Sequence, residues 1–369
     1  MSSDLRLQVD PKASLPIAAQ ISEQLHWLIV NGNLAEGDQL PSAQELAEEL
    51  GVNLHTVRSA YQQLESLHLV SLGRGRRARV LPYDRDRQLE VSTTVRSNTI
   101  GVIIPEFVQV YATLLGAIES AASELPALIF VANAHDDPDK AQALIDRLIA
   151  RGVDGIVVAA AVLLDPTTIV PRLAHTPTVF IDAPGAPGIS IEFDLEKSQY
   201  LATSHLIEHG HTRIGYVTPP HHLGNVKPKL AGHHRALEEA GIDVDPDLIV
   251  EMESFQVAEG EAGAARLLEQ TDRPTAITAA SDSLAVGVYQ AARRLGMAIP
   301  DDLAVTSNDN SQLSAISDPA LTTVSLPFAR AGELAVEAIQ RVFAVGDTEP
   351  SQTTLDVDLV IRQSCGCEH

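Results

Sequence analysis

Four arginines, Arg74, Arg76, Arg77 and Arg79, lie within six residues of one another. Guanidinium groups bind phosphate oxygens, so such a cluster could contact a nucleic-acid backbone. Residues 1–97 carry 10 Lys and Arg against 12 Asp and Glu, whereas residues 98–369 carry 16 against 37. The acidic part would limit non-specific DNA binding while the basic part could still touch phosphate. On charge alone, a solvated surface cluster explains the pattern equally well.

A second set of polar and aromatic side chains follows apolar segments that are typical of strands. Ligands of parallel α/β sheets bind beyond the carboxyl ends of the strands, and carboxylates and amides there can hydrogen-bond to hydroxyl groups. The candidates are Glu106, Phe107, Gln109, Tyr111, Asp182, Asp194, Ser281, Asp282, Asn308, Asp309 and Asn310. Tyr111 or Phe107 could stack on the apolar face of a sugar. Structural roles stay open for Asp282 and Asp309 at helix or strand ends and for Asp194 at a hinge.

Histidines and cysteines occur at spacings that metals can use. His205 and His209 are separated by one helical turn, while Cys365 and Cys367 flank one glycine near His369. No carboxylate completes an H-E-x-x-H pattern. We therefore predict structural histidines, a flexible tail with surface thiols, and no metal site.

Motifs of catalysis and cofactor binding do not stand out. The chain contains no G-x-S-x-G, no phosphate-binding G-x-x-x-x-G-K loop, and no G-x-G-x-x-G after a strand, so we predict neither an enzyme nor a bound cofactor. Hydrophobic residues make up 45% of the 369 positions and charged residues 20%, as in globular domains. No secretory signal or membrane-length apolar stretch is visible. We expect a cytoplasmic protein without membrane contacts.

The elements that position the arginines are small. Hydrophobic spacing over residues 14–66 predicts three short helices. Ser42 and Glu45 have the spacing of a capping box, Gly51 ends the second helix, and Asn53 caps the third. Residues 69–72 and 78–81 predict a hairpin with an Arg- and Gly-rich tip. The A-x3-G-x5-V spacing at Ala47, Gly51 and Val57, followed by this hairpin, indicates a winged helix-turn-helix.

From residue 98 onward, apolar strands alternate with amphipathic helices. The strand candidates are 99–104, 128–132, 155–159, 178–181, 213–217, 248–252, 276–279, 303–306 and 322–325. Alternation of this kind predicts parallel sheets covered on both faces, and the length of the segment favours two lobes. We expect an α+β winged-helix domain over residues 1–82, a linker over 83–97, and a two-lobed α/β ligand domain over 98–369. Lobe 1 would comprise about 98–190 and 323–345, and lobe 2 about 195–318 and 350–364.

Residues 14–81 resemble the GntR-type winged-helix DNA-binding domain. The Gly-Asp-x-Leu-Pro-Ser run at 37–42, the E-L-A at 45–47 and the T-V-R at 56–58 carry the resemblance. It implies that the third helix enters the major groove and that the hairpin touches the minor groove. By position it assigns DNA contacts to Ser42, Gln44, Asn53, His55, Thr56 and Arg58, and the hairpin adds Arg74, Arg76 and Arg77.

The chain also departs from the GntR pattern. The family commonly has Arg in place of Gln44 and often in place of Leu54, and Gly in place of Arg77. Loss of an arginine removes a reader of guanine. The operator sequence is therefore not transferable from relatives.

Residues 98–364 resemble the LacI/GalR-type effector domain, which has the periplasmic-binding-protein fold. The stretches NTIGVIIPEF, LATSHLIEHGHTRIGYV, KLAGHHRALEEAGI and ITAASDSLAVGVYQAARRLG carry the resemblance. It implies a ligand between two lobes, and it places Lys229 where the family usually has an Arg that grips ligand hydroxyls. The combination of the two domains is similar to an arabinose-responsive repressor type.

Together these features predict a sequence-specific transcriptional regulator, most simply a homodimeric repressor of carbohydrate uptake or catabolism genes. A small polyhydroxylated effector would control its binding to a double-stranded DNA operator. Two alternatives stay open. The ligand domain alone would suit a solute-binding protein of a transport system, and the effector could be a nucleoside or purine-like molecule.

Overall fold

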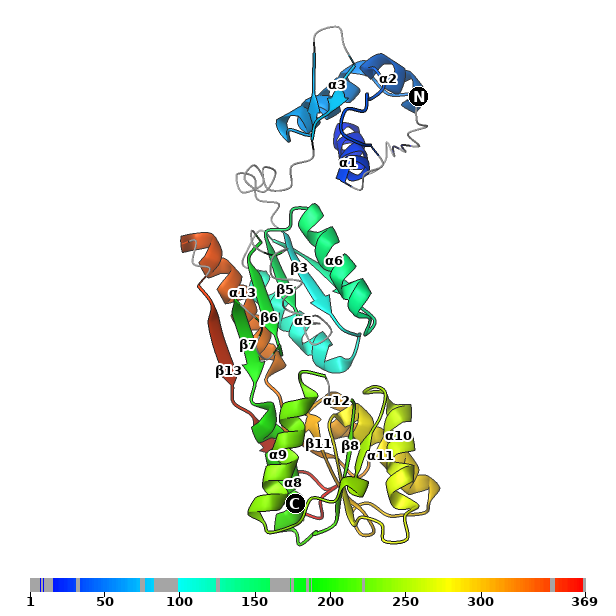
Figure 1. The fold of residues 1–369 in the computed structure, drawn as a ribbon, viewed down its shortest axis with the longest axis vertical. Coiled ribbons are helices and arrows are strands. Elements are labelled where there is room, and N and C mark those ends of the chain that lie inside the picture. Colours follow the sequence, from blue (N-terminus) through cyan, green and yellow to red (C-terminus); the bar gives the residue numbers. More distant parts are fainter. Residues whose placement is uncertain are drawn as a thin grey trace. The chain divides into compact units, whose positions relative to one another are not determined.

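The structure is a computed structural model. It describes residues 7, 9, 16–30, 34–73, 77–82, 99–123, 127–159, 173, 176–183, 186, 188–220, 223–345 and 349–367. The chain forms two compact units, Met1–Ser97 and Asn98–His369 (Figure 1). The predicted linker 83–97 lies outside the described residues, as do Arg74 and Arg76. Each unit is described by itself below.

The N-terminal unit has the winged-helix order that the sequence predicts. Its elements are α1 (Ile17–Val30), α2 (Ala43–Leu50), α3 (Leu54–Ser66), β1 (Val70–Ser71) and β2 (Arg79–Val80). The two strands are antiparallel, with Val70 opposite Val80. Apolar side chains from the three helices and the hairpin form one buried cluster, which includes Ile21, Leu46 and Val57. Burial of this cluster holds the third helix and the hairpin together.

Local sequence signals set the helix ends in this unit. The Ser42 hydroxyl accepts a hydrogen bond from the Glu45 N–H, and the Glu45 carboxylate accepts one from the Ser42 N–H, so the predicted capping box is confirmed. Gly51 ends α2 with φ of 63°, a conformation that favours glycine. The Asn53 side chain caps α3 by accepting a hydrogen bond from the His55 N–H. The turn between α2 and α3 is thereby fixed.

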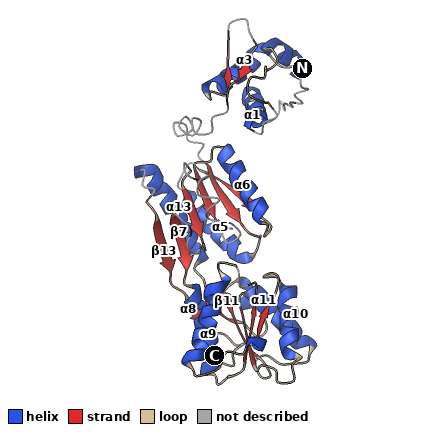
Figure 2. Ribbon diagram, in the orientation of Figure 1, coloured by secondary structure: helices blue, strands red, loops and turns tan. Residues whose placement is uncertain are grey.

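The C-terminal unit contains two six-stranded sheets, and Figure 2 shows helices on both faces of them. The first sheet has the order β13-β7-β6-β5-β3-β4 and is parallel throughout. Its strands are β3 (Thr99–Ile104), β4 (Leu128–Asn133), β5 (Gly155–Val158), β6 (Thr178–Ile181), β7 (Ile189–Phe193) and β13 (Ser351–Leu355). Helices α5 (Gln109–Ala122) and α13 (Phe328–Val345) contribute to one buried core, and α6 (Pro138–Ala150) contributes to another.

The second sheet has the order β14-β12-β11-β10-β8-β9, and only the pairing of β14 with β12 is antiparallel among its described ladders. Its strands are β8 (Ile214–Thr218), β9 (Ile249–Glu251), β10 (Ala276–Ala279), β11 (Ala304–Asp309), β12 (Thr322–Ser325) and β14 (Asp358–Val360). Helices α8 (Leu195–Glu208) and α9 (Val226–Glu239) pack together, as do α10 (Val257–Leu268) and α11 (Asp282–Arg294). A 3-10 turn (Pro246–Leu248) precedes β9, and α12 (Gln312–Ile316) follows β11.

The predicted lobe limits require correction. We assigned 323–345 to the first lobe and 350–364 to the second, but β12 pairs with β11 in the second sheet, and β13 pairs with β7 in the first. The chain therefore passes between the lobes after β7, after β12 and between β13 and β14. Two of these passages touch, because the Asp194 N–H donates to the carbonyl oxygen of Leu355 and the Lys197 ammonium pairs with Asp356.

Close helix packing in the second lobe supports a stability prediction. A Cβ atom on Gly287 would lie 2.2 Å from the Val257 carbonyl oxygen and 2.4 Å from the Glu261 nitrogen. Because these are backbone atoms, α10 and α11 would have to separate. Gly287→Ala should lower the free energy of unfolding by about 2 kcal/mol or more.

Gly116→Ala provides the matched control, because this exposed helical glycine has open space around it. That change should raise stability by up to about 1 kcal/mol through helix propensity. Urea unfolding of both variants measures the difference. Equal midpoints for Gly287→Ala and the parent chain would contradict the close packing.

Candidate nucleic-acid interface and ligand site

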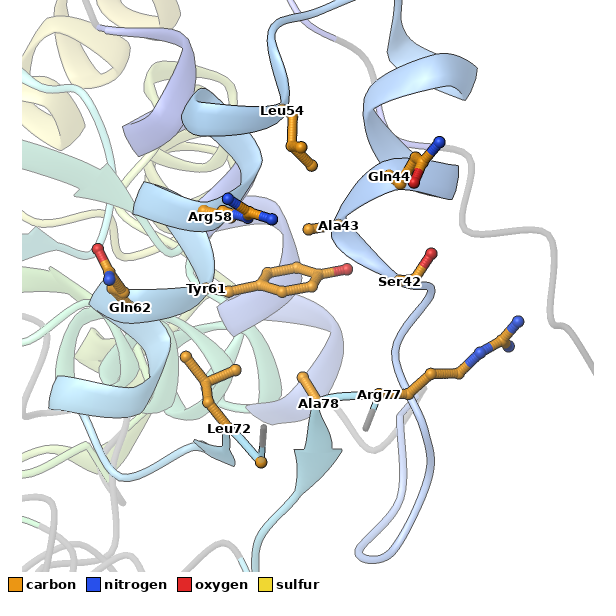
Figure 3. A pocket seen from close by; sticks show the side chains of 11 residues that line it. Ser42, Ala43, Gln44, Leu54, Arg58, Tyr61, Gln62, Leu72, Arg77 and Ala78 are labelled. Atoms are coloured by element: carbon orange, nitrogen blue, oxygen red, sulfur yellow. The ribbon is translucent and has the colours of Figure 1, made fainter. Parts of the chain in front are cut away.

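Four predicted DNA-contact residues, Ser42, Gln44, Arg58 and Arg77, line one hollow of about 490 Å3 in the N-terminal unit. Its other lining residues are Ala43, Leu54, Tyr61, Gln62, Leu72, Gly73 and Ala78. Figure 3 shows Arg58 and Tyr61 extending from α3 toward the chain around Ser42 and Ala43. The Tyr61 hydroxyl donates to the Pro41 carbonyl oxygen at 2.8 Å. Helix α2, helix α3 and the hairpin thus present polar and cationic groups to the same space.

The two arginines of this hollow differ in their surroundings. The Arg77 guanidinium donates to the Glu45 carboxylate at 2.6 Å, and both side chains are about half exposed. Hydrogen bonds from Ser42, chiefly from its backbone N–H, and the charge of Arg77 lower the pKa of Glu45. Among the described residues, Arg58 makes no ion pair. Arg58 is therefore less restrained than Arg77 among the two arginines that line the hollow.

The other predicted contacts lie elsewhere in the N-terminal unit. Asn53, His55 and Thr56 form the start of α3, where the side chain of Asn53 is used as a cap. Asn53 and His55 are exposed. None of the three lines the hollow. They stay predictions, as do Arg74 and Arg76, which lie outside the described residues.

In the C-terminal unit, the structure brings Tyr111, Asp182, Lys229 and Asp309 into one electrostatic neighbourhood. Asp182 follows β6 of the first lobe, and Asp309 ends β11 of the second. Burial raises the pKa of Asp182, while the Lys229 charge opposes that rise. The same balance raises the pKa of Asp309 to about 8, again with Lys229 opposing. The charge of one buried ammonium therefore acts on two carboxyl groups contributed by different lobes.

The backbone at these positions is unusual for residues other than glycine. Asp182 has φ of 54° and Asp309 has φ of 115°, and Asn310 follows with φ of 53°. Left-handed conformations at non-glycine residues cost about 1–3 kcal/mol each and concentrate at functional sites. Both sheets thus turn sharply where their strands end, and they direct polar residues toward the boundary between the lobes.

Asn225 completes this neighbourhood and was absent from the sequence-based predictions. Its amide donates to Asp182 Oδ2 at 3.3 Å and links α9 of the second lobe to the first lobe. The remaining side-chain oxygens, Asp182 Oδ1 and Asn225 Oδ1, are buried without a hydrogen-bond partner among the described residues. Asn225 lies one helical turn before Lys229, and that spacing is the signal that could have found it.

Lys229 and Tyr111 border the same region. Lys229 is 4% exposed, and its ammonium donates to the Ala280 carbonyl oxygen at 2.8 Å. Tyr111 packs edge-on against Phe328 with ring centroids 5.8 Å apart. Burial, together with the charges of Asp182 and Asp309, raises the pKa of the Tyr111 hydroxyl. The region therefore combines an ammonium, carboxyl groups, an amide and an aromatic face.

Three other predicted ligand residues make structural contacts, and their ligand roles stay predictions. Asp282 is 1% exposed, and its two oxygens accept hydrogen bonds from Ser307, Ser311 and Thr323. Ser281 caps α11, and Asp194 caps α8. These contacts match the structural alternatives that the sequence left open for Asp194 and Asp282.

Glu106 and Gln109 lie at the entrance to α5 of the first lobe. Glu106 accepts hydrogen bonds from Asn133 and the Phe107 N–H, which lower its pKa together with His135. The Gln109 amide donates to Gln312 of the second lobe at 3.0 Å. Gln109 is thus a direct contact between the lobes.

The raised pKa of Asp309 predicts a pH-dependent stability. The unfolded carboxyl loses its proton near pH 4 and the folded one near pH 8, so the stability contributed by the protonated group is lost as pH rises through this window. Asp309→Asn imitates the protonated form. Between pH 5 and pH 8, the free energy of unfolding of Asp309→Asn should rise relative to that of the parent chain by on the order of 2 kcal/mol, after a discount for the partial exposure of Asp309.

Chemical unfolding at both pH values measures this change. Asp301→Asn is the control, because Asp301 is exposed in the same lobe. A stability difference between Asp309→Asn and the parent that does not vary with pH would contradict the assignment.

The predicted surface thiols are wrong for Cys365, which is 2% exposed. Cys365 and Cys367 lie against His205 and His209 of the α8 end, with ligand atoms within 4.8 Å of one another. Burial opposes ionisation of Cys365, but hydrogen bonds from His205 and Thr322 outweigh it and lower the pKa to about 6. His369 lies outside the described residues.

Each of the two units is similar to a known protein family. Residues 17–80 match the gntR family of bacterial regulatory proteins, and residues 203–365 match a periplasmic binding protein-like domain. The HTH-type transcriptional repressor PurR of Aliivibrio salmonicida is 31% identical over 257 residues, which cover 69% of this chain and 76% of that protein.

Solved structures give the same result. The transcription regulator CcpA of Lactococcus lactis is 27% identical with a TM-score of 0.65, over 73% of this chain and 99% of that one. A LacI family transcriptional regulator from Enterococcus faecium with bound ribose is 26% identical with a TM-score of 0.65, over 72% of this chain and 98% of that one.

The fold and the two sites define a DNA-binding protein with an attached ligand-binding domain. The chain belongs to the LacI/GalR-type transcriptional repressors, and its DNA-binding domain is of the gntR type. Both predicted resemblances are confirmed. The relatives are transcriptional regulators, which are not enzymes. Among the described helices, none has the length and apolar character needed to cross a membrane.

Proposed function

We propose that this repressor controls genes of carbohydrate uptake or catabolism and that a small polyhydroxylated effector binds between its two lobes. The observation that carries the proposal is the group formed by the buried Asp182 and Lys229 and the partly buried Asn225 and Asp309, in which two buried oxygens lack partners among the described residues. Unpaired buried oxygens cost free energy that a hydrogen-bonding ligand would recover.

The chemistry of this group suits a neutral ligand with several hydroxyls. A hydroxyl can donate to Asp182 Oδ1 or Asn225 Oδ1 and can accept from Lys229. The Asp309 carboxyl, with its pKa near 8, can donate as well as accept at neutral pH. Tyr111 offers an aromatic ring that could stack on the apolar face of a sugar. A strongly anionic ligand is disfavoured, because it would meet two carboxyl groups and a single ammonium.

The relatives support a sugar or a ribose-containing molecule. The Enterococcus faecium regulator is described with bound ribose. The similarity to repressors named PurR keeps a nucleoside or purine-like effector as the second candidate. A sugar and a nucleoside share vicinal hydroxyls, whereas a free purine base has none. Binding of the sugar, the nucleoside and the free base, each measured alone, therefore separates the candidates. A solute-binding role is disfavoured by the match of residues 17–80 to a DNA-binding family.

On the DNA side, we propose that Ser42, Gln44, Arg58 and Arg77 contact the operator across the hollow of the N-terminal unit. Asn53, His55 and Thr56 at the start of α3 would add base or backbone contacts, and Arg74 and Arg76 would add phosphate contacts. A two-fold homodimer would present two such surfaces to a pseudo-palindromic operator.

Effector binding would shift an equilibrium between two lobe arrangements. Gln109 with Gln312 and Asp182 with Asn225 are two side-chain contacts between the lobes in the described arrangement. The three chain passages between the lobes allow rotation without unfolding either sheet. The effector can shift operator affinity only by its differential affinity for the two arrangements.

The test combines two measurements on the full chain. A thermal-shift screen with sugars, polyols and nucleosides should identify a ligand that raises the melting temperature. A gel-shift titration on the DNA upstream of the chain's own gene should then show retardation that this ligand changes. No retardation at any salt concentration would refute the regulator proposal for this DNA, and no response to any hydroxylated ligand would refute the effector class.

A further inference from the structure

Four potential metal ligands converge at the end of α8, outside the ligand site. His205 lies in the last turn of α8, and His209 is the residue that ends the helix. Cys365 and Cys367 come from the C-terminal segment, more than 150 positions further along the chain. One ligand atom from each of the four lies within 4.8 Å of every other. Two imidazoles and two thiols form the ligand set of a structural zinc site.

The distances between these groups already approach tetrahedral geometry. Cys367 Sγ lies 3.1 Å from His209 Nε2 and 3.6 Å from His205 Nε2. Bond lengths of about 2.3 Å to sulfur and 2.0 Å to nitrogen give tetrahedral ligand–ligand distances of about 3.3–3.8 Å. The widest separation, 4.8 Å, therefore needs a contraction of about one ångström on metal binding.

The local backbone presents both sulfurs to the same side. Gly366, between the cysteines, has φ of 89°, a conformation that L side chains rarely adopt. Its N–H donates to the Gln363 carbonyl oxygen and closes a turn. On α8, the spacing of four residues places the two imidazole rings next to each other, with centroids 4.8 Å apart.

Outer contacts orient the candidate ligands. His205 Nδ1 faces the Glu208 carboxylate at 3.8 Å, while its Nε2 faces Cys367. The Thr322 hydroxyl donates to Cys365 Sγ at 3.2 Å. A carboxylate behind a histidine and a donor to a thiolate are the supports that metal ligands usually have. Cys365 and His205 are buried, whereas His209 is exposed and leaves a path for the ion.

We propose that His205, His209, Cys365 and Cys367 bind one Zn²⁺ in a closed tetrahedral site. Four protein ligands leave no position for substrate, so the site is structural. The metal would fasten the C-terminal segment to α8 of the second lobe. The same segment is tied to the second sheet by Ser364, whose hydroxyl donates to the Val305 carbonyl oxygen. Thiolate ligands favour zinc over magnesium, calcium or manganese.

The test uses the full chain, purified under reducing conditions and loaded with Zn²⁺ or Co²⁺. We expect one tightly bound Zn²⁺ per chain by elemental analysis. Co²⁺ should give the ligand-field bands of tetrahedral coordination and a thiolate-to-cobalt charge-transfer band. A strong chelator should lower the melting temperature by about 5 °C or more, because it removes a ligand that stabilises the folded chain.

Variants assign the ligands. His209→Gln changes an exposed side chain, so it should leave the fold intact and weaken Zn²⁺ binding about 100-fold or more. The double variant Cys365→Ser with Cys367→Ser should remove the charge-transfer band and the chelator effect. His211→Gln is the matched control, because His211 lies two residues beyond His209 and bonds to Thr275 instead. His211→Gln should keep the charge-transfer band and the chelator effect.

Several results would overturn the proposal. They are absence of bound metal in reduced protein supplied with Zn²⁺, a cobalt spectrum without thiolate charge transfer, and equal metal loss in His211→Gln and His209→Gln. A disulfide between Cys365 and Cys367 that persists under reducing conditions would also overturn it, because oxidised sulfur does not bind the ion.

Discussion

Lys229→Met is expected to weaken effector binding about 100-fold and to abolish induction at effector concentrations that saturate the parent protein, while operator affinity stays unchanged. Lys229 is the buried cation of the proposed effector site, and it balances Asp182 and Asp309 from different lobes. A hydrogen bond from a charged group contributes about 1.5–3 kcal/mol, which corresponds to roughly 10–150-fold in affinity. Methionine retains most of the side-chain volume, so the change removes charge rather than packing.

Calorimetric titration with the effector and gel-shift titration with and without it measure the two properties separately. Lys227→Met is the control, because Lys227 is exposed on the same helix two residues earlier. Normal induction in Lys229→Met would refute the site. Loss of operator binding together with a lower melting temperature would show that Lys229 instead supports the fold.

The winged helix could be predicted almost completely from sequence because its signals are local. A capping box at Ser42, a left-handed glycine at position 51 and an Asn53 cap each depend on neighbouring residues. Most buried strands of the C-terminal unit were also predictable, since their continuous apolar runs are typical of parallel sheets. The bounds of β3, β6, β10 and β12 agree with the prediction.

The sequence prediction missed three described strands, β7, β13 and β14, because each lacks that signal. β7 lies inside its sheet, but Ser190 and Glu192 interrupt the apolar run of its sequence ISIEF. β13 has the sequence SQTTL with mainly exposed residues, and β14 has only three residues. Each lies at the edge of its sheet, so neither needs an apolar run on two faces. Their sheet membership depends on pairing with β7 and β12, which is information that no local window contains. The lobe assignments of β12 and β13 were wrong for the same reason.

The two candidate sites show a similar division. Asp182 and Asp309 were predictable because carboxyl ends of parallel strands converge, whatever the details of the fold. Asn225 lies seven residues beyond the end of β8 and directly before α9, so a search of the residues right after each strand does not reach it. The histidine and cysteine cluster needs the C-terminal segment to return to α8, and neither spacing alone predicts this contact.

Replacing Arg58 and Arg77 together by alanine is expected to lower operator affinity about 100-fold or more at physiological salt. These are the two cations that line the hollow formed by α2, α3 and the hairpin. Removing one phosphate-binding cation should reduce the magnitude of the slope of log affinity against log salt by about 0.9. The double variant should therefore reduce it by about 1.8 for each N-terminal unit bound to DNA. Arg151→Ala removes the same charge from an exposed position of the other unit and should leave the slope unchanged.

Glu45→Gln separates a DNA contact from a purely structural arginine. Glu45 holds Arg77 at 2.6 Å, and glutamine can still accept the capping hydrogen bond from Ser42. If Arg77 contacts phosphate, removing the competing carboxylate should strengthen binding to any DNA sequence several-fold and steepen its salt dependence. If Arg77 only fastens the hairpin to α2, the same change should weaken binding. Salt-dependent titrations of both variants separate the two roles. If Arg77 contacts phosphate, Glu45→Gln should raise DNA affinity, because it frees the cation, while the double variant lowers it. If Arg77 is only structural, both variants should lower DNA affinity.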